Sequence, residues 1–148
     1  MTIDTSGKWW VGDSPQDLDE YLQAYSSDSY PTKAFRLARC TCGSEVFELE
    51  ADDDEGVARR TCVACRCAHY ICESDEYLED ASPKKWRCVA GCRSTHTNVG
   101  VGFALYDDDP TGIKWLYVGE RCAKCGVLGC FAGWKVAESN ALHLMDKV

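Results

Sequence analysis

The sequence lacks the long apolar runs that membrane and secreted proteins carry. No segment approaches the roughly 20 consecutive apolar residues of a membrane-spanning helix. The first residues, MTIDTSGKWWVGDSPQD, have no basic start followed by an apolar run, so they do not match a secretory signal. We therefore expect a cytoplasmic protein with no membrane partner, in which cysteine thiols stay reduced.

Positive charge is also scarce. Lysine and arginine number 16 and aspartate and glutamate 24, which gives 148 residues a formal net charge of −8. Affinity for nucleic acid depends on a basic surface that releases counterions from the phosphates. This balance argues against a general nucleic-acid binder, and we expect a partner with a basic face.

Cysteine, in contrast, is abundant. There are 11 cysteines, and because the number is odd a full disulfide framework would leave one thiol unpaired. Eight of them form four short pairs: Cys40 and Cys42, Cys62 and Cys65, Cys88 and Cys92, and Cys122 and Cys125. In a reducing compartment, clustered cysteines bind metal more often than each other, so the pairs predict metal sites.

The spacing of the pairs suits zinc. Zn²⁺ takes four ligands in a tetrahedron, so two short cysteine pairs on tight turns complete the shell around one ion. Backbone N–H groups in such turns offset the charge of the thiolates. Glycine after the second cysteine suits the turn because it tolerates positive φ. Gly43 and Gly126 stand there, whereas Arg66 and Arg93 do not fit this detail.

The segments between the pairs repeat each other. The first reads FEL and then DDDEGV, and the second reads FAL and then DDDPTGI. An alternating apolar stretch that meets an acidic, glycine-containing turn and a second β-prone stretch predicts a hairpin. We expect short third strands at 68–72 and 127–136. The fold class predicted is mainly β with small α content.

Each copy resembles a zinc ribbon, the small β fold with two cysteine-bearing knuckles around one zinc. The resemblance covers 35–72 and 86–136, although the common knuckle is C-x2-C-G and the first knuckles here are C-x-C-G and C-x3-C. Two Zn²⁺ per chain are expected, held by Cys40, Cys42, Cys62, Cys65, Cys88, Cys92, Cys122 and Cys125. Two alternatives stay open in the first copy: Cys67 could replace Cys65, and His69 could complete a site with three cysteines.

The predicted organisation adds a helical segment to the two ribbons. Residues 1–34 form the helical segment, 35–72 the first ribbon, 73–85 a linker, and 86–148 the second ribbon with a tail. Asp13 or Ser14 can cap the helix. Its apolar stripe, expected to pack on the ribbons, comprises Leu18, Tyr21, Leu22 and Tyr25. Cys72 and Cys130 are expected in the core.

Three functions compete. The first is a non-enzymatic acidic module that binds a basic protein, by analogy with small acidic proteins that neutralise toxins or nucleases. The second is nucleic-acid binding at Lys84, Lys85, Trp86 and Arg87, where Trp86 would stack on an unpaired base. The third is a redox or metal-dependent enzyme, but a dithiol catalyst expects a βαβ context, which is absent. No residue is predicted to be catalytic.

Overall fold

The computed structural model describes residues 3–137 and 139–148. Its fold is mainly β with small α content, which confirms the predicted fold class. The elements are β1 (Ile3–Asp4), β2 (Val11–Gly12), α1 (Asp17–Ser26), β3 (Ala34–Leu37), β4 (Phe47–Asp52), β5 (Val57–Cys62), β6 (Ala68–Tyr70), the 3₁₀ helix η1 (Ser74–Glu76), β7 (Lys84–Lys85), β8 (Thr97–Leu105), β9 (Ile113–Cys122), β10 (Leu128–Trp134) and the 3₁₀ helix η2 (Ala141–Asp146).

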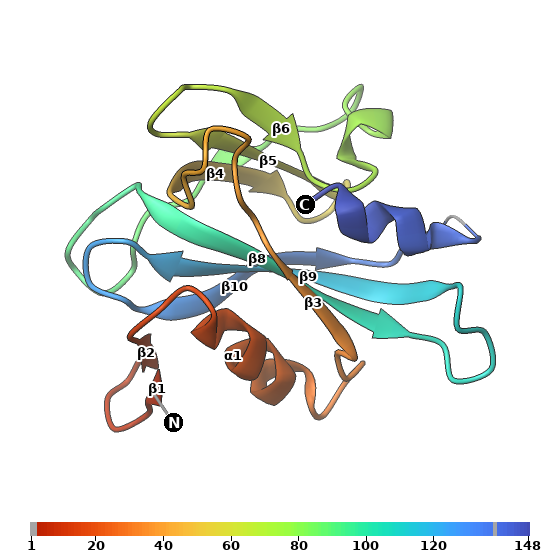
Figure 1. Cartoon of the computed structure of the whole chain (residues 1–148), viewed down its shortest axis with the longest axis horizontal. Coiled ribbons are helices and arrows are strands. Elements are labelled where there is room, and N and C mark those ends of the chain that lie inside the picture. Colours follow the sequence, from red (N-terminus) through yellow and green to blue (C-terminus); the bar gives the residue numbers. More distant parts are fainter. Residues whose placement is uncertain (1–2, 138) are drawn as a thin grey trace.

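One sheet contains both copies of the repeated unit. Its main path runs in the order β10, β9, β8, β4, β5, β6, and β3 and β7 join it at β8 and β4 (Figure 1). The predicted hairpins are present as the antiparallel pairs β4–β5 and β8–β9. The predicted third strands are β6, which pairs with β5, and β10, which pairs with β9.

The two hairpins meet at corresponding residues. Phe47 begins β4 and pairs with Thr97, which begins β8. Phe47 also pairs with Cys62 at the end of β5, and Thr97 pairs with Cys122 at the end of β9. Because neighbouring strands lie about 4.8 Å apart, the Cα atoms of Cys62 and Cys122 stand roughly 14 Å apart across this four-strand row.

The segments that lead into the two units are exchanged between them. β3 precedes the first unit but pairs with β8 of the second, and Ala38 N–H donates to the Val99 carbonyl at 2.8 Å. β7 precedes the second unit but pairs with β4 of the first, and Trp86 N–H donates to the Leu49 carbonyl at 2.8 Å. The predicted linker 73–85 thus supplies a strand, while the division into separately folding parts stays a prediction.

The hydrophobic core runs through both units. A single cluster of buried side chains includes Phe47 and Leu49 from β4, Phe103 from β8 and Leu116 from β9. A β-bulge in β9 shifts its register with β8: Ala104 pairs with Trp115 but Leu105 pairs with Ile113, so one residue of β9 is left over. Ile113, Trp115 and Tyr117 alternate in the sequence, but the bulge puts Ile113 on the other face: Ile113 joins this cluster, and Trp115 and Tyr117 do not.

Helix α1 packs on β8, β9 and β10, over the second unit (Figure 1). Leu18 and Leu22 are fully buried there, and they come close because Gly119 offers no side chain: a Cβ on it would lie 3.1 Å from Leu22. Tyr25, expected in the buried stripe, is 54 % exposed.

The helix begins later than its predicted caps, at Asp17. Neither Asp13 nor Ser14 caps it with a side chain. Instead, Asp17 Oδ2 accepts hydrogen bonds from the backbone N–H groups of Asp13, at 2.8 Å, and Ser14, at 3.2 Å. None of the described helices is long and apolar enough to cross a bilayer.

Candidate metal centres

The four cysteine pairs bring their sulfurs together in two groups of four. In each group all Sγ atoms lie within 4.8 Å of one another: Cys40, Cys42, Cys62 and Cys65 in the first, and Cys88, Cys92, Cys122 and Cys125 in the second. An ideal ZnS₄ tetrahedron has S–S edges of about 3.8 Å. The separations Cys40–Cys65, 3.4 Å, and Cys92–Cys122, 3.5 Å, are close to that edge. Either group could hold a metal ion.

All four knuckles close with the same backbone hydrogen bond, although their lengths differ. The N–H of the first cysteine donates to the carbonyl two residues after the second cysteine. The pairs are Cys40 with Ser44, Cys62 with Cys67, Cys88 with Ser94, and Cys122 with Val127, each at 2.9 Å. The C-x-C and C-x3-C knuckles therefore differ in the number of residues between their two cysteines, but the same backbone hydrogen bond closes them.

The residue after the second cysteine is left-handed in every knuckle. Its φ is +95° at Gly43 and +80° at Gly126, and it is also positive at Arg66, +67°, and Arg93, +59°. The two arginines therefore differ from the two glycines in residue type but adopt the same left-handed backbone conformation. A residue with a Cβ costs about 1–2 kcal/mol in this conformation, so both arginines are held there against a local preference.

Replacing Arg93 by glycine is expected to stabilise the protein. Arg93 is exposed, and its side chain makes no hydrogen bond or ion pair with any described residue. The substitution therefore removes the backbone strain and few contacts. We expect the free energy of unfolding to rise by about 0.5–1 kcal/mol, the strain relieved less the added entropy of glycine in the unfolded chain. Chemical denaturation of the metal-loaded protein measures it.

Gly91 in the same knuckle provides the matched control. Its φ is +97°, and a Cβ there would meet nothing within 4 Å. Gly91→Ala should therefore destabilise by about 1 kcal/mol through backbone strain alone. A stability loss in Arg93→Gly would show that the arginine side chain, rather than its backbone conformation, matters at this position.

Backbone amides stabilise thiolates in both groups. In the first, the N–H groups of Cys65 and Ala64 lower the pKa of Cys62 to about 6. In the second, the N–H of Ser94 lowers the pKa of Cys92 to about 7. Metal ligation requires the thiolate form, so each group offers at least one sulfur already poised to bind near neutral pH.

The two alternatives for the first site are placed outside the group of four sulfurs. Cys67 is exposed, and its carbonyl closes the knuckle. His69 lies 2.9 Å, through Nε2, from the carbonyl oxygen of Lys147. Of the cysteines expected in the core, Cys72 is buried, as predicted, and Cys130 is only partly buried.

The residues of the nucleic-acid alternative are placed unfavourably for that role. Trp86 is 4 % exposed and belongs to the core, which corrects the expectation that its ring could stack on a base. Lys85 pairs with Glu48 at 3.6 Å. Lys84 and Arg87 remain exposed, but nothing aromatic and exposed stands between them.

Sequence reasoning missed two features near the second unit. Glu120 is a carboxyl in the core, 8 % exposed, two residues before Cys122. Tyr25, Tyr30 and Trp115 gather with Tyr117 around a hollow beside β10. No local signal distinguishes these positions, because both features depend on how distant segments meet across the sheet.

Comparison of the chain with protein-family models, curated proteins and solved structures finds no match. The two candidate metal centres and the surface around them therefore have to be interpreted from their own geometry. The resemblance to zinc ribbons rests on the cysteine knuckles and hairpins alone.

Proposed function

We propose that this is a non-enzymatic zinc protein of the cytoplasm that acts as an acidic protein-interaction module for a basic partner. The observation that carries the proposal is the pair of four-sulfur groups. Four thiolates fill a tetrahedral shell and leave no position for water or substrate, which is the mark of a structural rather than a catalytic zinc.

Zinc suits these groups better than most metals. Four sulfurs in a tetrahedron favour Zn²⁺ or iron over the hard cations that prefer oxygen ligands. Zinc has no redox chemistry of its own, so it fits a role in holding the fold. Metal analysis decides the point: zinc gives a colourless protein, and iron with visible absorption would contradict the proposal.

Metal binding would make an acidic protein more acidic. Eight thiolates contribute −8 and two Zn²⁺ contribute +4, so the formal charge moves from −8 to −12. A surface with this excess attracts basic proteins and speeds encounter with them. Exposed aromatic side chains, which are common at the centres of protein interfaces, are available in Trp9, Tyr25 and Tyr30.

Three arginines of the first unit support this choice over nucleic acid. Arg59 pairs with Glu50, and Arg66 pairs with Glu48 at 2.6 Å. Arg60 is 7 % exposed and donates to the Val148 carbonyl oxygen at 2.7 Å. Side chains engaged in this way would have to leave their partners before they could bind phosphates, which weakens the electrostatic gain.

Binding measurements test the proposal. Zinc-loaded protein is used to capture partners from the native cell, and each captured protein is then produced alone and titrated directly at low salt and at about 0.15 M salt. We expect a basic protein that binds directly and more weakly as salt rises. Labelled single-stranded RNA and duplex DNA are titrated in parallel, and flat curves are expected.

One outcome would reverse the assignment. Submicromolar binding of RNA or DNA that weakens steeply with salt and is lost in Lys84→Glu/Lys85→Glu would promote the nucleic-acid function. The double variant is a fair probe because both lysines are exposed, so it changes local charge without opening the core.

A further inference from the structure

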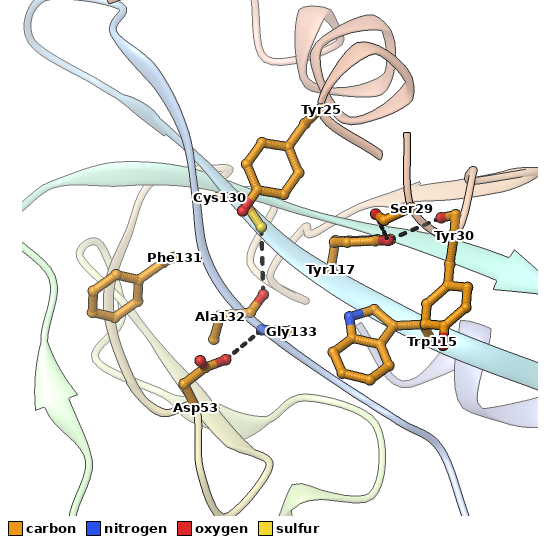
Figure 2. Close-up of a pocket in the computed structure, with 10 residues that line it drawn as sticks. All are labelled: Tyr25, Ser29, Tyr30, Asp53, Trp115, Tyr117, Cys130, Phe131, Ala132 and Gly133. Atoms are coloured by element: carbon orange, nitrogen blue, oxygen red, sulfur yellow. Dashed lines mark hydrogen bonds between the residues drawn. The ribbon is translucent and has the colours of Figure 1, made fainter. Parts of the chain in front are cut away.

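An aromatic hollow lies on the surface formed by α1, β9 and β10, apart from both metal centres. Its volume is about 320 Å³, at the lower end of ligand pockets. Figure 2 shows Tyr25 at one end, Asp53 at the other, and Trp115 with Tyr30 along one side. These residues come from α1, the β4–β5 turn, β9 and the segment after α1, so only the folded chain assembles the hollow.

The rings of the hollow hold one another in place. Tyr30 and Trp115 have ring centroids 5.6 Å apart, and Tyr25 and Tyr117 stand edge to face at 5.9 Å. The Tyr117 hydroxyl donates to the Tyr30 carbonyl at 2.9 Å, which ties the segment after α1 to β9. The ring faces are therefore presented by a preorganised wall, which reduces the entropy lost on binding.

A carboxylate faces this aromatic wall. Asp53 is exposed at the tip of the first hairpin, and its Oδ1 accepts the backbone N–H of Gly133 at 2.8 Å (Figure 2). That bond fixes the position of the carboxylate beside the hollow. A second hollow adjoins the first, shares Asp53 and Trp115, and adds Asp54 and Glu55.

The chain itself shows that a cation is accepted at this wall. Lys114 Nζ lies 4.5 Å from the centroid of the Tyr30 ring. Such contact between an ammonium group and a ring face is a cation–π interaction. Among the charged residues that line the adjoining hollow, Lys135 is basic and Asp53, Asp54 and Glu55 are acidic.

We propose that this hollow binds an arginine side chain of the basic partner, with the guanidinium stacked on Trp115 and paired with Asp53. The inference rests on the proposed function, since it names the chemistry of the partner's contact. Arginine fits better than lysine because its planar guanidinium stacks on an aromatic face and offers several N–H donors to a carboxylate at the same time. The net charge of the chain, −8, also favours a cationic ligand.

A short peptide tests the site without knowledge of the partner. The probe is an acetylated Gly-Arg-Gly-Arg-Gly peptide, and its matched control carries citrulline, which keeps the shape of arginine and removes the charge. Both are titrated into the zinc-loaded full chain at low salt by calorimetry, and the Trp115 indole N–H is followed by NMR. We expect the arginine peptide to bind at least tenfold more tightly and to shift the Trp115 resonance.

Matched variants locate the binding. Asp53→Asn keeps an oxygen for the Gly133 N–H and removes only the charge, and Trp115→Leu keeps apolar bulk and removes the ring. We expect affinity for the arginine peptide to fall about fivefold and about tenfold, respectively. Asp108→Asn changes the corresponding exposed hairpin tip of the second unit and should leave affinity within twofold.

The outcomes separate this inference from the proposed function. Equal binding of the two peptides, or binding that Asp53→Asn and Trp115→Leu leave unchanged, would overturn the arginine site. A basic partner could still bind elsewhere on the acidic surface in that case, and the function would stand. NMR spectra of the variants guard against misfolding, because a folded variant with unchanged affinity counts against the site.

Discussion

Removal of zinc is expected to unfold the whole protein. The purified chain should carry two zinc ions, and a strong chelator should release both with loss of β structure. Binding of a structural zinc is coupled to folding and contributes on the order of 10 kcal/mol per site, so the two sites together exceed the roughly 5–15 kcal/mol that typically stabilises a domain. Metal analysis and circular dichroism during chelation measure the effect. One zinc per chain would contradict the two-site assignment.

Serine substitutions assign the ligands. Cys40→Ser, Cys62→Ser, Cys88→Ser and Cys122→Ser should each remove one zinc. Cys130→Ala should keep both, because Cys130 lies outside the two groups. Cys67→Ser and Cys65→Ser form the decisive pair for the first site. If Cys67→Ser lost a zinc and Cys65→Ser did not, the ligand set of the first site would be wrong.

Loss of one zinc should also weaken the other half of the protein. Cys62 ends β5 and pairs with Phe47, and Cys122 ends β9 and pairs with Thr97. Phe47 and Thr97 pair with each other, so the two cysteines belong to one sheet. A disordered first knuckle would therefore loosen the strand on which the second one depends. We expect Cys62→Ser to lower the thermal midpoint of the entire molecule in a single transition rather than to melt one half alone.

Replacing Glu120 by glutamine is expected to stabilise the protein at alkaline pH. Burial raises the pKa of the Glu120 carboxyl to about 8, although a hydrogen bond from the Trp86 side chain opposes the shift. Its Oε2 has no hydrogen-bond partner among the described residues. Ionisation in this setting is costly, and glutamine can accept the same bond from Trp86 while staying neutral.

The pH dependence follows from the direction of the shift. The folded state favours the protonated carboxyl, whereas the unfolded chain ionises near pH 4.3. The cost of Glu120 therefore grows as pH rises from about 4.3 and is complete above about 8. We expect Glu120→Gln to raise the free energy of unfolding by on the order of 3 kcal/mol at pH 8 and by about half as much at pH 6.

Paired denaturation curves of zinc-saturated wild type and variant measure this difference. The cysteine ligands are identical in both proteins, so the pH dependence of zinc binding cancels in the comparison. Glu79→Gln is the matched control, because Glu79 is exposed, and it should change stability little at either pH. A difference between Glu120→Gln and wild type that does not vary with pH would show that Glu120 is not buried as a neutral acid.

The local parts of the fold could be predicted from the sequence, because each one is encoded in a short segment. The acidic turns and alternating strands predicted both hairpins, and the structure contains them. The spacing of the cysteines predicted two groups of four ligands, and the structure brings the sulfurs of the same residues together. Zinc binding at these groups remains a proposal. Arg66 and Arg93 were the exception, since tertiary closure of the knuckle imposed a φ that their own preference opposes.

The long-range parts could not be predicted, because no short segment encodes them. The residues Lys84 and Lys85 are polar and follow an acidic stretch, which predicted a linker, yet they pair with β4. Trp86 follows two lysines, which suggested an exposed ring. Its backbone N–H instead donates a hydrogen bond to the Leu49 carbonyl, and the ring is buried in the core. The β-bulge in β9 similarly separates Ile113, which faces the core, from Trp115 and Tyr117, which line the hollow.

The exchange of β3 and β7 gives the chain the geometry of a two-fold dimer joined into one polypeptide. In an isologous dimer the same surface meets itself, so a residue of one subunit faces its own counterpart at the axis. Here Phe47 and Thr97, each five positions after the second cysteine of its knuckle, face each other in the same way, and each half lends its leading strand to the other. Either half cut out alone would expose an unpaired edge strand that a second copy of that half could cover.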